Sequence, residues 1–113
     1  MPDIEDYRFG LIVIDGAEHT DDVIILPDRV VTKWWRQNGH ALVLHDLSKV
    51  LEDLPERLVV GAGAHGRMRP APAALEALRD RGIEVEVHNT EEAVRRYRAA
   101  DAAHTAAALH LTC

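Results

Sequence analysis

The sequence predicts an α/β protein in which a β-α-β-α-β unit follows a small N-terminal antiparallel sheet. After residue 57, short apolar runs alternate with amphipathic helical patterns, and this alternation is typical of parallel strands joined by helices. Before residue 40, strand-like runs are separated by turn residues, as in a β-hairpin or an antiparallel sheet. Because crossovers between parallel strands are right-handed, we expect the helices to lie over the sheet.

The composition is that of a soluble globular chain, with 47% hydrophobic and 28% charged residues. The length of 113 residues predicts a single domain, residues 1–113, with residues 1–6 as a loose lead-in. The formal net charge of −6 argues against a nucleic acid or an anionic membrane as the main partner, and no apolar run approaches the ~20 residues of a membrane helix. A single cysteine and an acidic N-terminus lead us to expect a cytoplasmic protein.

The first strand is expected at residues 8–14, a β-rich run that ends at the strong hairpin signal Asp15-Gly16. The apolar run 23–26 predicts the second strand. Residues 29–35 are then expected to pair back as a third antiparallel strand. These segments together predict one small antiparallel sheet in the first third of the chain.

An amphipathic helix is expected at residues 47–54, where leucine and valine recur at helical spacing until Pro55 ends the pattern. The unbroken apolar run 58–60 predicts a strand that is covered on both faces. A second helix is expected at about residues 72–81, with Gly82 as its left-handed cap.

Residues 83–87 alternate apolar and charged side chains, as in a strand near the edge of a sheet. Thr90 is expected to cap the next helix, whose first turn contains Glu91 and Glu92. The last strand is expected at residues 106–111. Because alanine is a poor strand former, tertiary packing must override local propensity there.

The segment Gly61-Ala62-Gly63-Ala64-His65-Gly66 follows a predicted strand and matches the G-x-G-x-x-G spacing of dinucleotide-binding folds. In those folds the helix opens inside the motif, so that its first amides meet the pyrophosphate. Here residues 67–72 intervene before the helix, so we expect no dinucleotide and no other cofactor. The simpler interpretation is a glycine turn that lets the strand and the helix pack closely.

The clearest candidate site is the edge of the sheet where the carboxyl ends of the three later strands meet, since ligands of open α/β sheets bind there. Two arginines, backbone amides freed by glycine and a helix N-terminus would suit a small anion such as phosphate or carboxylate. The candidate ligand-binding residues are Gly61, Gly63, His65, Arg67, Arg69, Asn89, Thr90 and His110. The alternative is that the arginines are solvated and that Asn89 and Thr90 only cap a helix.

The sequence contains no complete catalytic set. Its seven histidines form no H-E-x-x-H or C-x-x-C arrangement, so no metal site is expected. Cys113 could form a thiolate pair with His110 or His65, but a nucleophile on a fraying terminus is hard to position. We therefore expect a binding protein rather than an enzyme.

Two adjacent tryptophans, Trp34 and Trp35, would point to opposite faces of a strand. One of them is expected in the core, and the other would be an exposed anchor for a partner protein. Together with Arg36, they are the candidate partner-binding residues.

Seven stretches of the chain carry a family resemblance: Phe9-Gly10, Ile12 to Gly16, Asp22 to Val31, Trp34-Trp35-Arg36, Gly39-His40, Val60 to Gly63 and Ala107 to Cys113. They resemble a family of small uncharacterised domains that includes adipogenesis-associated domain-containing protein and mitochondrial NADH dehydrogenase (complex I) assembly factor three. The likeness covers about residues 5–113. The resemblance implies a layered α/β/α core with an attached antiparallel hairpin, and an undefined biochemical activity with an assembly-factor role in the mitochondrial branch.

The resemblance supplies no catalytic residues, and the alanine- and arginine-rich chain looks prokaryotic. We favour a non-catalytic protein-interaction or assembly-factor-like module, monomeric or weakly self-associating, with an unknown protein partner. The alternative is a protein or enzyme that binds a small anion or small molecule at the strand ends, around the glycine loop 61–66. The two hypotheses differ in whether the strand ends form an open cleft or are filled by the protein's own side chains.

Overall fold

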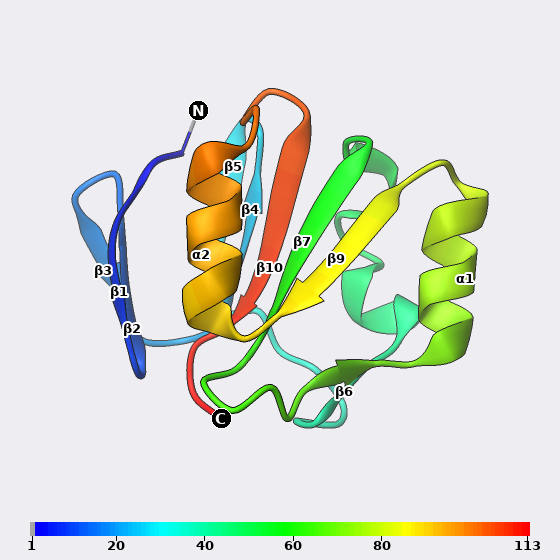
Figure 1. Ribbon diagram of the computed structural model, residues 1–113, viewed down its shortest axis with the longest axis horizontal. Coiled ribbons are helices and arrows are strands. Elements are labelled where there is room, and N and C mark those ends of the chain that lie inside the picture. Colours follow the sequence, from blue (N-terminus) through cyan, green and yellow to red (C-terminus); the bar gives the residue numbers. More distant parts are fainter. Residues whose placement is uncertain (1) are drawn as a thin grey trace.

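A mixed five-stranded sheet is the centre of the computed structural model, which describes residues 2–113 (Figure 1). Its strand order is β5-β4-β10-β7-β9. The parallel strands are β7 (Arg57–Ala62), β9 (Glu84–His88) and β10 (Thr105–His110). The helices α1 (Pro72–Asp80) and α2 (Thr90–Ala99) connect them. The predicted β-α-β-α-β unit and the α/β fold class are confirmed.

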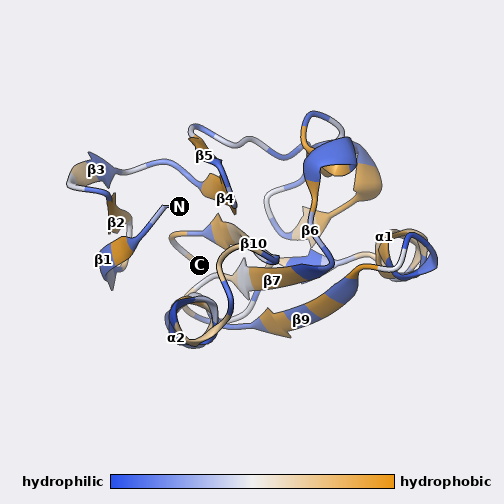
Figure 2. Ribbon diagram, turned by 90° about the horizontal axis from the view of Figure 1, so that it is seen from above, coloured by the Kyte–Doolittle hydropathy of each residue, from blue (hydrophilic) through white to orange (hydrophobic). Residues whose placement is uncertain are grey.

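The two helices cover opposite faces of this sheet. The chain moves outward from β7 to β9 and then back past β7 to β10. With right-handed crossovers, this reversal changes the face that the connecting helix covers. Leu78 of α1 packs into one apolar cluster, and Val94 and Tyr97 of α2 pack into the other, so the sheet lies between two apolar layers (Figure 2).

The N-terminal segment is not loose, which corrects the expectation for residues 1–6 as far as the structure describes them. Strand β1 (Ile4–Arg8) begins inside that segment, and the Ile4 side chain is fully buried. The Tyr97 hydroxyl donates to the Pro2 carbonyl oxygen over 3.3 Å. Burial of Ile4 in the apolar cluster under α2 is what orders this segment.

The first third of the chain forms parts of two sheets instead of one. The antiparallel strands β1, β2 (Leu11–Ile14) and β3 (Ala17–His19) form a separate sheet, with a turn at Gly10 inside the segment expected as a single strand. The predicted hairpin at Asp15-Gly16 is confirmed, and both residues have the positive φ that such a turn requires, 50° and 81°.

Strand β4 (Val23–Leu26) pairs antiparallel with β10, so it belongs to the central sheet. All four of its side chains are buried, which explains the unbroken apolar run. Strand β5 (Arg29–Val31) pairs with β4 and stops well before Trp35, because the backbone turns at Lys33 with a φ of 53°. The predicted strand over residues 29–35 is therefore too long.

The helix expected at residues 47–54 is instead a pair of short 3-10 turns, η1 (Leu44–Leu47) and η2 (Leu51–Asp53). Leu47 and Val50 are buried, so the predicted apolar side is correct. A 3-10 turn can present the same stripe over a few residues, which is why spacing alone did not distinguish it from an α-helix. The short parallel strands β6 (Ala41–Leu42) and β8 (Arg69–Pro70) tie this region to the glycine loop.

Candidate functional site

The carboxyl ends of β7 and β10 meet at the point where the direction of the strand order reverses, the usual ligand site of an open α/β sheet. Here the protein fills that position itself. A Cβ atom on Gly63 would lie 2.5 Å from the carbonyl carbon and oxygen of Cys113. A Cβ atom on Gly61 would lie 2.9 Å from Leu109 Cδ2 and 3.0 Å from Thr90 Oγ1. The glycines thus allow the chain to pack on itself.

Thr90 closes the same position from α2. Its side chain is fully buried, and its hydroxyl accepts from Gly63 N over 2.9 Å and donates to the His110 carbonyl oxygen over 2.5 Å. The helix cap is Asn89 rather than Thr90, because the Asn89 side chain accepts from Glu92 N over 2.9 Å. The single hydroxyl proton of Thr90 is therefore donated to another group of the protein.

The structure does not carry the predicted cationic residues into this closed position. His65 and Arg67 on the loop after β7 and Arg69 at the start of β8 are exposed, and within residues 2–113 their side chains form no ion pair. Several loop amides already donate to backbone carbonyls: Ala64 N to Thr112 O, Gly66 N to Gly63 O and Met68 N to Ala62 O. Of the eight candidate ligand-binding residues, Gly61, Gly63, Thr90 and His110 come together, and the others lie outside.

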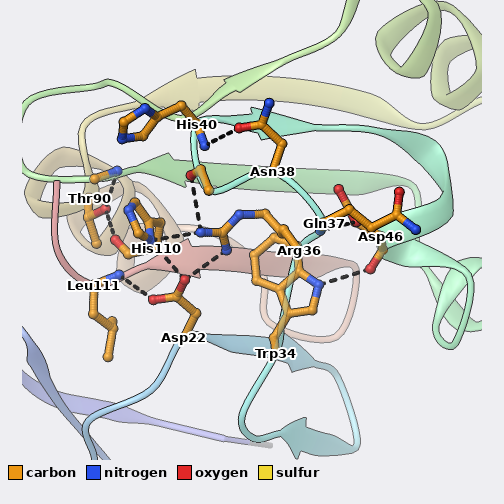
Figure 3. A network of polar contacts seen from close by, with 12 residues as sticks. Asp22, Trp34, Arg36, Gln37, Asn38, His40, Asp46, Thr90, His110 and Leu111 are labelled. Carbon is orange, nitrogen blue, oxygen red and sulfur yellow. Dashed lines mark hydrogen bonds and ion pairs between the residues drawn. The ribbon is translucent and has the colours of Figure 1, made fainter.

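A buried polar cluster, defined by Asp22, Arg36 and His110, lies beside the filled strand ends (Figure 3). Asp22 Oδ2 accepts from Arg36 Nη1 over 2.7 Å and lies 2.8 Å from His110 Nδ1. The second oxygen, Asp22 Oδ1, accepts from Leu111 N over 2.8 Å. One carboxylate therefore joins the start of β4, the segment after β5 and the end of β10.

Arg36 is a core residue, which corrects its assignment as a partner-binding candidate. Its side chain is only 4% exposed, and its guanidinium carbon lies 4.8 Å from the centre of the Trp34 ring, as in a cation–π contact. Trp34 is also buried, and its Nε1 donates to the Asp46 carbonyl oxygen over 2.9 Å. The Nε of Arg36 is buried without a hydrogen-bond partner among the residues described.

Opposing effects act on the Asp22 carboxyl. Burial by itself would raise its pKa, but hydrogen bonds from His110, the Leu111 amide and Arg36 outweigh burial and hold the pKa below its ordinary value. His110 Nδ1 also lies 3.0 Å from Arg36 Nη2, and a guanidinium can only donate. In any one tautomer, Nδ1 can donate to the Asp22 carboxylate or accept from Arg36, but not both.

An aspartate–histidine pair is one part of a general acid–base site, but the rest of such a site is missing here. Within residues 2–113, no hydroxyl or thiol forms a hydrogen bond with the His110 ring. Both Asp22 oxygens are occupied by groups of the protein. The arrangement works as a cross-link between distant parts of the chain.

A groove of about 240 Å³ lies beside Trp35 on the described surface, and we call it the tryptophan groove. Trp35 is 75% exposed at its rim. The polar and aromatic residues that line it include Lys33, Trp34, Trp35, His45, Asp46 and Lys49, and its apolar floor includes Ile24, Val31 and Val50. The expectation that one tryptophan lies in the core while the other is exposed is thus met by Trp34 and Trp35, respectively.

The tryptophan groove is basic although the chain as a whole carries a net charge of −6. Within residues 2–113, neither Lys33 nor Lys49 forms an ion pair. The Asp46 carboxylate, in contrast, is engaged by the backbone amides of Val43 and Gln37 at 3.0 and 3.3 Å. Sequence analysis missed this groove and Asp22, because nothing in the local pattern indicates which segments the fold brings together.

The fold defines a small α/β domain with one central mixed sheet, in which Gly61, Gly63, Thr90 and the backbone of Cys113 pack together at the topological switch point. The chain belongs to the family described as "Protein of unknown function (DUF498/DUF598)", which matches residues 4–110. This match confirms the family expected from the sequence, and it leaves the activity undefined.

Solved structures share the whole fold. The conserved hypothetical protein PH1505 from Pyrococcus horikoshii OT3 is 29% identical with a TM-score of 0.82, and the match covers 98% of this chain and 99% of that one. The protein MT938 is 26% identical with a TM-score of 0.78 over the full length of both chains. An Mth938-like domain protein from Bordetella pertussis is 20% identical with a TM-score of 0.78; the match covers 97% of this chain and 85% of that one, and it shows the fold alone.

Neither a membrane-spanning helix nor a metal-binding cluster occurs among the described residues. No helix in residues 2–113 is long and apolar enough to cross a membrane. The same residues contain no group of three or more His, Cys, Asp or Glu side chains that could hold a metal ion.

Proposed function

We propose that the protein is a non-catalytic protein-interaction module that holds an acidic segment of a partner protein in the tryptophan groove. The observation that carries the proposal is Trp35, a large aromatic side chain that is 75% exposed at the rim of a groove. Single exposed apolar residues are common, but tryptophan is the residue most enriched at binding hot spots. A groove beside it offers a pocket for an apolar side chain of the partner.

The charge of the groove indicates the charge of the partner segment that would bind there. Lys33 and Lys49 line the groove without intramolecular carboxylate partners in the described chain, and Asp46 accepts from backbone amides. An acidic segment would neutralise both ammonium groups, and the overall negative charge of the protein would repel such a segment elsewhere. The preferred occupant is therefore an acidic peptide with one aliphatic or aromatic side chain.

The filled strand ends also favour this proposal over an enzyme. Residues that would otherwise hold a ligand at the switch point, Thr90 and Gly63, are hydrogen-bonded to each other, and the backbone of Cys113 lies against Gly63. The aspartate–histidine pair has no nucleophile in hydrogen-bond contact within residues 2–113. A mechanism that required substrate there would first have to displace buried backbone contacts.

The experiment uses a short synthetic peptide in which aspartate and glutamate flank one leucine, with a lysine-substituted peptide of the same length as control. Both tryptophans of the chain line the groove, so their fluorescence reports directly on its occupation. We expect the acidic peptide alone to change the emission, and we expect the change to weaken with salt because exposed charges are screened within about 10 Å at 0.1 M.

Variants then test the location with the labelled peptide and fluorescence anisotropy. Trp35→Ala and the double change Lys33→Glu with Lys49→Glu should each weaken binding about tenfold or more, as expected for a hot spot and its charges. Phe9→Ala is the matched control, because Phe9 is also an exposed aromatic residue, 61% accessible, on the β1–β2 turn. Equal binding by wild type and the groove variants would show that the groove is not the site.

Anion binding on the loop after β7 is the second candidate function. It is favoured by Arg67 and Arg69, two exposed guanidinium groups that form no ion pair in the described chain. Titration with inorganic phosphate, followed through the amide resonances of His65 and Arg67, should show saturable shifts that the double change Arg67→Gln with Arg69→Gln removes. Shifts that persist in that double variant would place the anion elsewhere.

A further inference from the structure

The outer edge of β9 is a third surface feature, separate from the tryptophan groove and from the filled strand ends. β9 is the last strand of the central sheet and has a single neighbour, β7. Its sequence is Glu-Val-Glu-Val-His, and Val87 is 40% exposed, one of three large apolar side chains exposed in the described chain. An unpaired edge of this kind is a template for another strand.

The backbone direction shows which groups are free. Glu84 N donates to Glu56 O over 2.8 Å, so the amide and carbonyl of Glu84 face β7. These directions alternate along a strand, so Glu86 and His88 also face β7, whereas Val85 and Val87 present their amides and carbonyls outward. The free edge thus offers two complete pairs of backbone donors and acceptors.

Two antiparallel registers with a second copy differ in their opposing residues. If the twofold axis passes through Val87, Val87 exchanges both backbone hydrogen bonds with its own equivalent, and Glu86 faces His88 of the second copy. If it passes through Glu86, Val85 faces Val87 and both outward pairs bond, but two Glu86 carboxylates lie opposite each other. Like charges directly opposite each other destabilise a strand pair, whereas an imidazole opposite a carboxylate is a favourable polar pair. The charges therefore select the register centred on Val87.

We propose that β9 pairs antiparallel with β9 of a second copy around Val87, which joins the two central sheets into one. In this register the valine side chains cover each other on one face, and the Glu86–His88 pairs meet on the other. Within one chain, Glu86 Oε2 already accepts from Arg57 Nη2 at 2.8 Å and Glu86 Oε1 lies 3.0 Å from His88 Nε2. The pairing would add Glu86–His88 contacts between the two copies to the Arg57–Glu86 and Glu86–His88 contacts within each copy.

The contact is small, because one five-residue strand carries it, so the dimer is weak and depends on concentration. It is independent of the tryptophan groove, which lies beside β5 at the opposite edge of the sheet. A second copy on β9 and a peptide in the groove can therefore be tested separately on the same protein.

The first test is sedimentation velocity over a concentration series that ends at about 1 mM, the range of weak complexes. Wild type should pass from monomer to dimer. Val87→Pro removes the outward amide without removing a hydrogen bond to β7, and proline is tolerated on such an edge, so it should weaken self-association about tenfold or more while the fold is kept. Val87→Thr keeps the amide and is the matched control. A wild type that stays monomeric, or a dimer that Val87→Pro leaves unchanged, would overturn the proposal.

The second test fixes the register by cysteine cross-linking in a Cys113→Ser background. Val87→Cys should form a disulfide-linked dimer under mild oxidation, because the two equivalents face each other. Glu84→Cys is more exposed, with the Glu84 side chain 80% accessible, but its equivalents would be about 20 Å apart at 3.3 Å per residue. Faster cross-linking through position 84 than through position 87 would mean that exposure alone governs the reaction, and the register would be wrong.

Discussion

Asp22 Oδ2 and His110 Nδ1 lie 2.8 Å apart although 88 positions separate the two residues in the chain. The same oxygen accepts from Arg36 Nη1, so one partly buried carboxylate neutralises the guanidinium and orients the imidazole. Because Arg36 stacks on Trp34, the contact also fixes the segment that carries Trp35 to the groove. The buried cluster is thus connected to the proposed docking surface through the packing of one tryptophan.

Asp22→Asn should be strongly destabilising, because it leaves the buried Arg36 charge without its counter-charge. Removing one partner of a buried ion pair costs about 3–5 kcal/mol. The free energy of unfolding in urea measures the loss. A double variant, Asp22→Asn with Arg36→Met, removes both charges and should lose less than the sum of the single losses; additive losses would mean that the two residues are not coupled.

Stability should fall in acid, partly through Asp22. The folded state holds the pKa of this carboxyl below its ordinary value of 3.8, so the stabilisation is present above pH 3.8 and is lost as the pH falls through the lower, folded value. Urea unfolding at a series of acidic pH values measures this slope. Asp22→Asn should show a shallower slope than wild type below pH 3.8, and equal slopes would assign the acid sensitivity to other groups.

Thr90→Val should destabilise the protein by about 2 kcal/mol, because two buried backbone groups lose their partner. The groups are Gly63 N and the His110 carbonyl oxygen. Thr90→Ser keeps the hydroxyl and should retain most of the stability. If valine and serine have the same effect on the free energy of unfolding, the hydroxyl contributes nothing and only the methyl group matters.

Gly63→Ala and Gly66→Ala separate two reasons for a glycine. Both positions have positive φ, 94° and 65°, so both substitutions carry a backbone penalty of about 1 kcal/mol. Only at Gly63 would the new Cβ also meet the Cys113 carbonyl group; Gly66 has nothing within 4 Å. Thermal unfolding should therefore show a larger loss for Gly63→Ala, with amide shifts confined to the glycine loop and the residues after β10.

The two tryptophans should differ sharply in their contribution to stability. Trp34→Ala removes a buried ring and its hydrogen bond to Asp46 O, and such losses cost about 3–5 kcal/mol. Trp35→Ala changes an exposed side chain and should remain within about 0.5 kcal/mol of wild type. Urea unfolding of both variants checks the assignment, and a large loss for Trp35→Ala would mean that the side chain packs against the domain.

The fold after residue 57 was predictable because its signals are local. Each signal depends only on neighbouring residues. The unbroken apolar run at 58–60 predicts a covered strand, and the alternation at 83–87 predicts an edge strand. Gly82 predicts the left-handed turn after a helix, where its φ is 82°. The N-terminal sheet was harder, since an apolar run such as 23–26 does not reveal which sheet its strand joins. The pairing of β4 with β10 joins residues that are more than 80 positions apart in the chain.

The candidate site was predictable in part for the same reason. Topology alone brought Gly63, Thr90 and His110 to one edge of the sheet, and the structure confirms that they meet there. Whether that edge is open or filled depends on the three residues after β10, and no periodicity encodes their path. Arg36 was grouped with the two tryptophans as a partner-binding candidate. A charged residue is buried only with a partner, and the partner of Arg36, Asp22, lies 14 positions away and is not visible in the local sequence.

The position of β10 has a consequence for how the protein is made. This strand comes last in the chain but sits in the middle of the central sheet, between β4 and β7. Until residues 105–110 have left the ribosome, β4–β5 and β7–β9 are two separate fragments with open edges. Synthesis from the N-terminus therefore postpones assembly of the central sheet until β10 has emerged after all its other strands, and the nascent chain is exposed to misassociation until then.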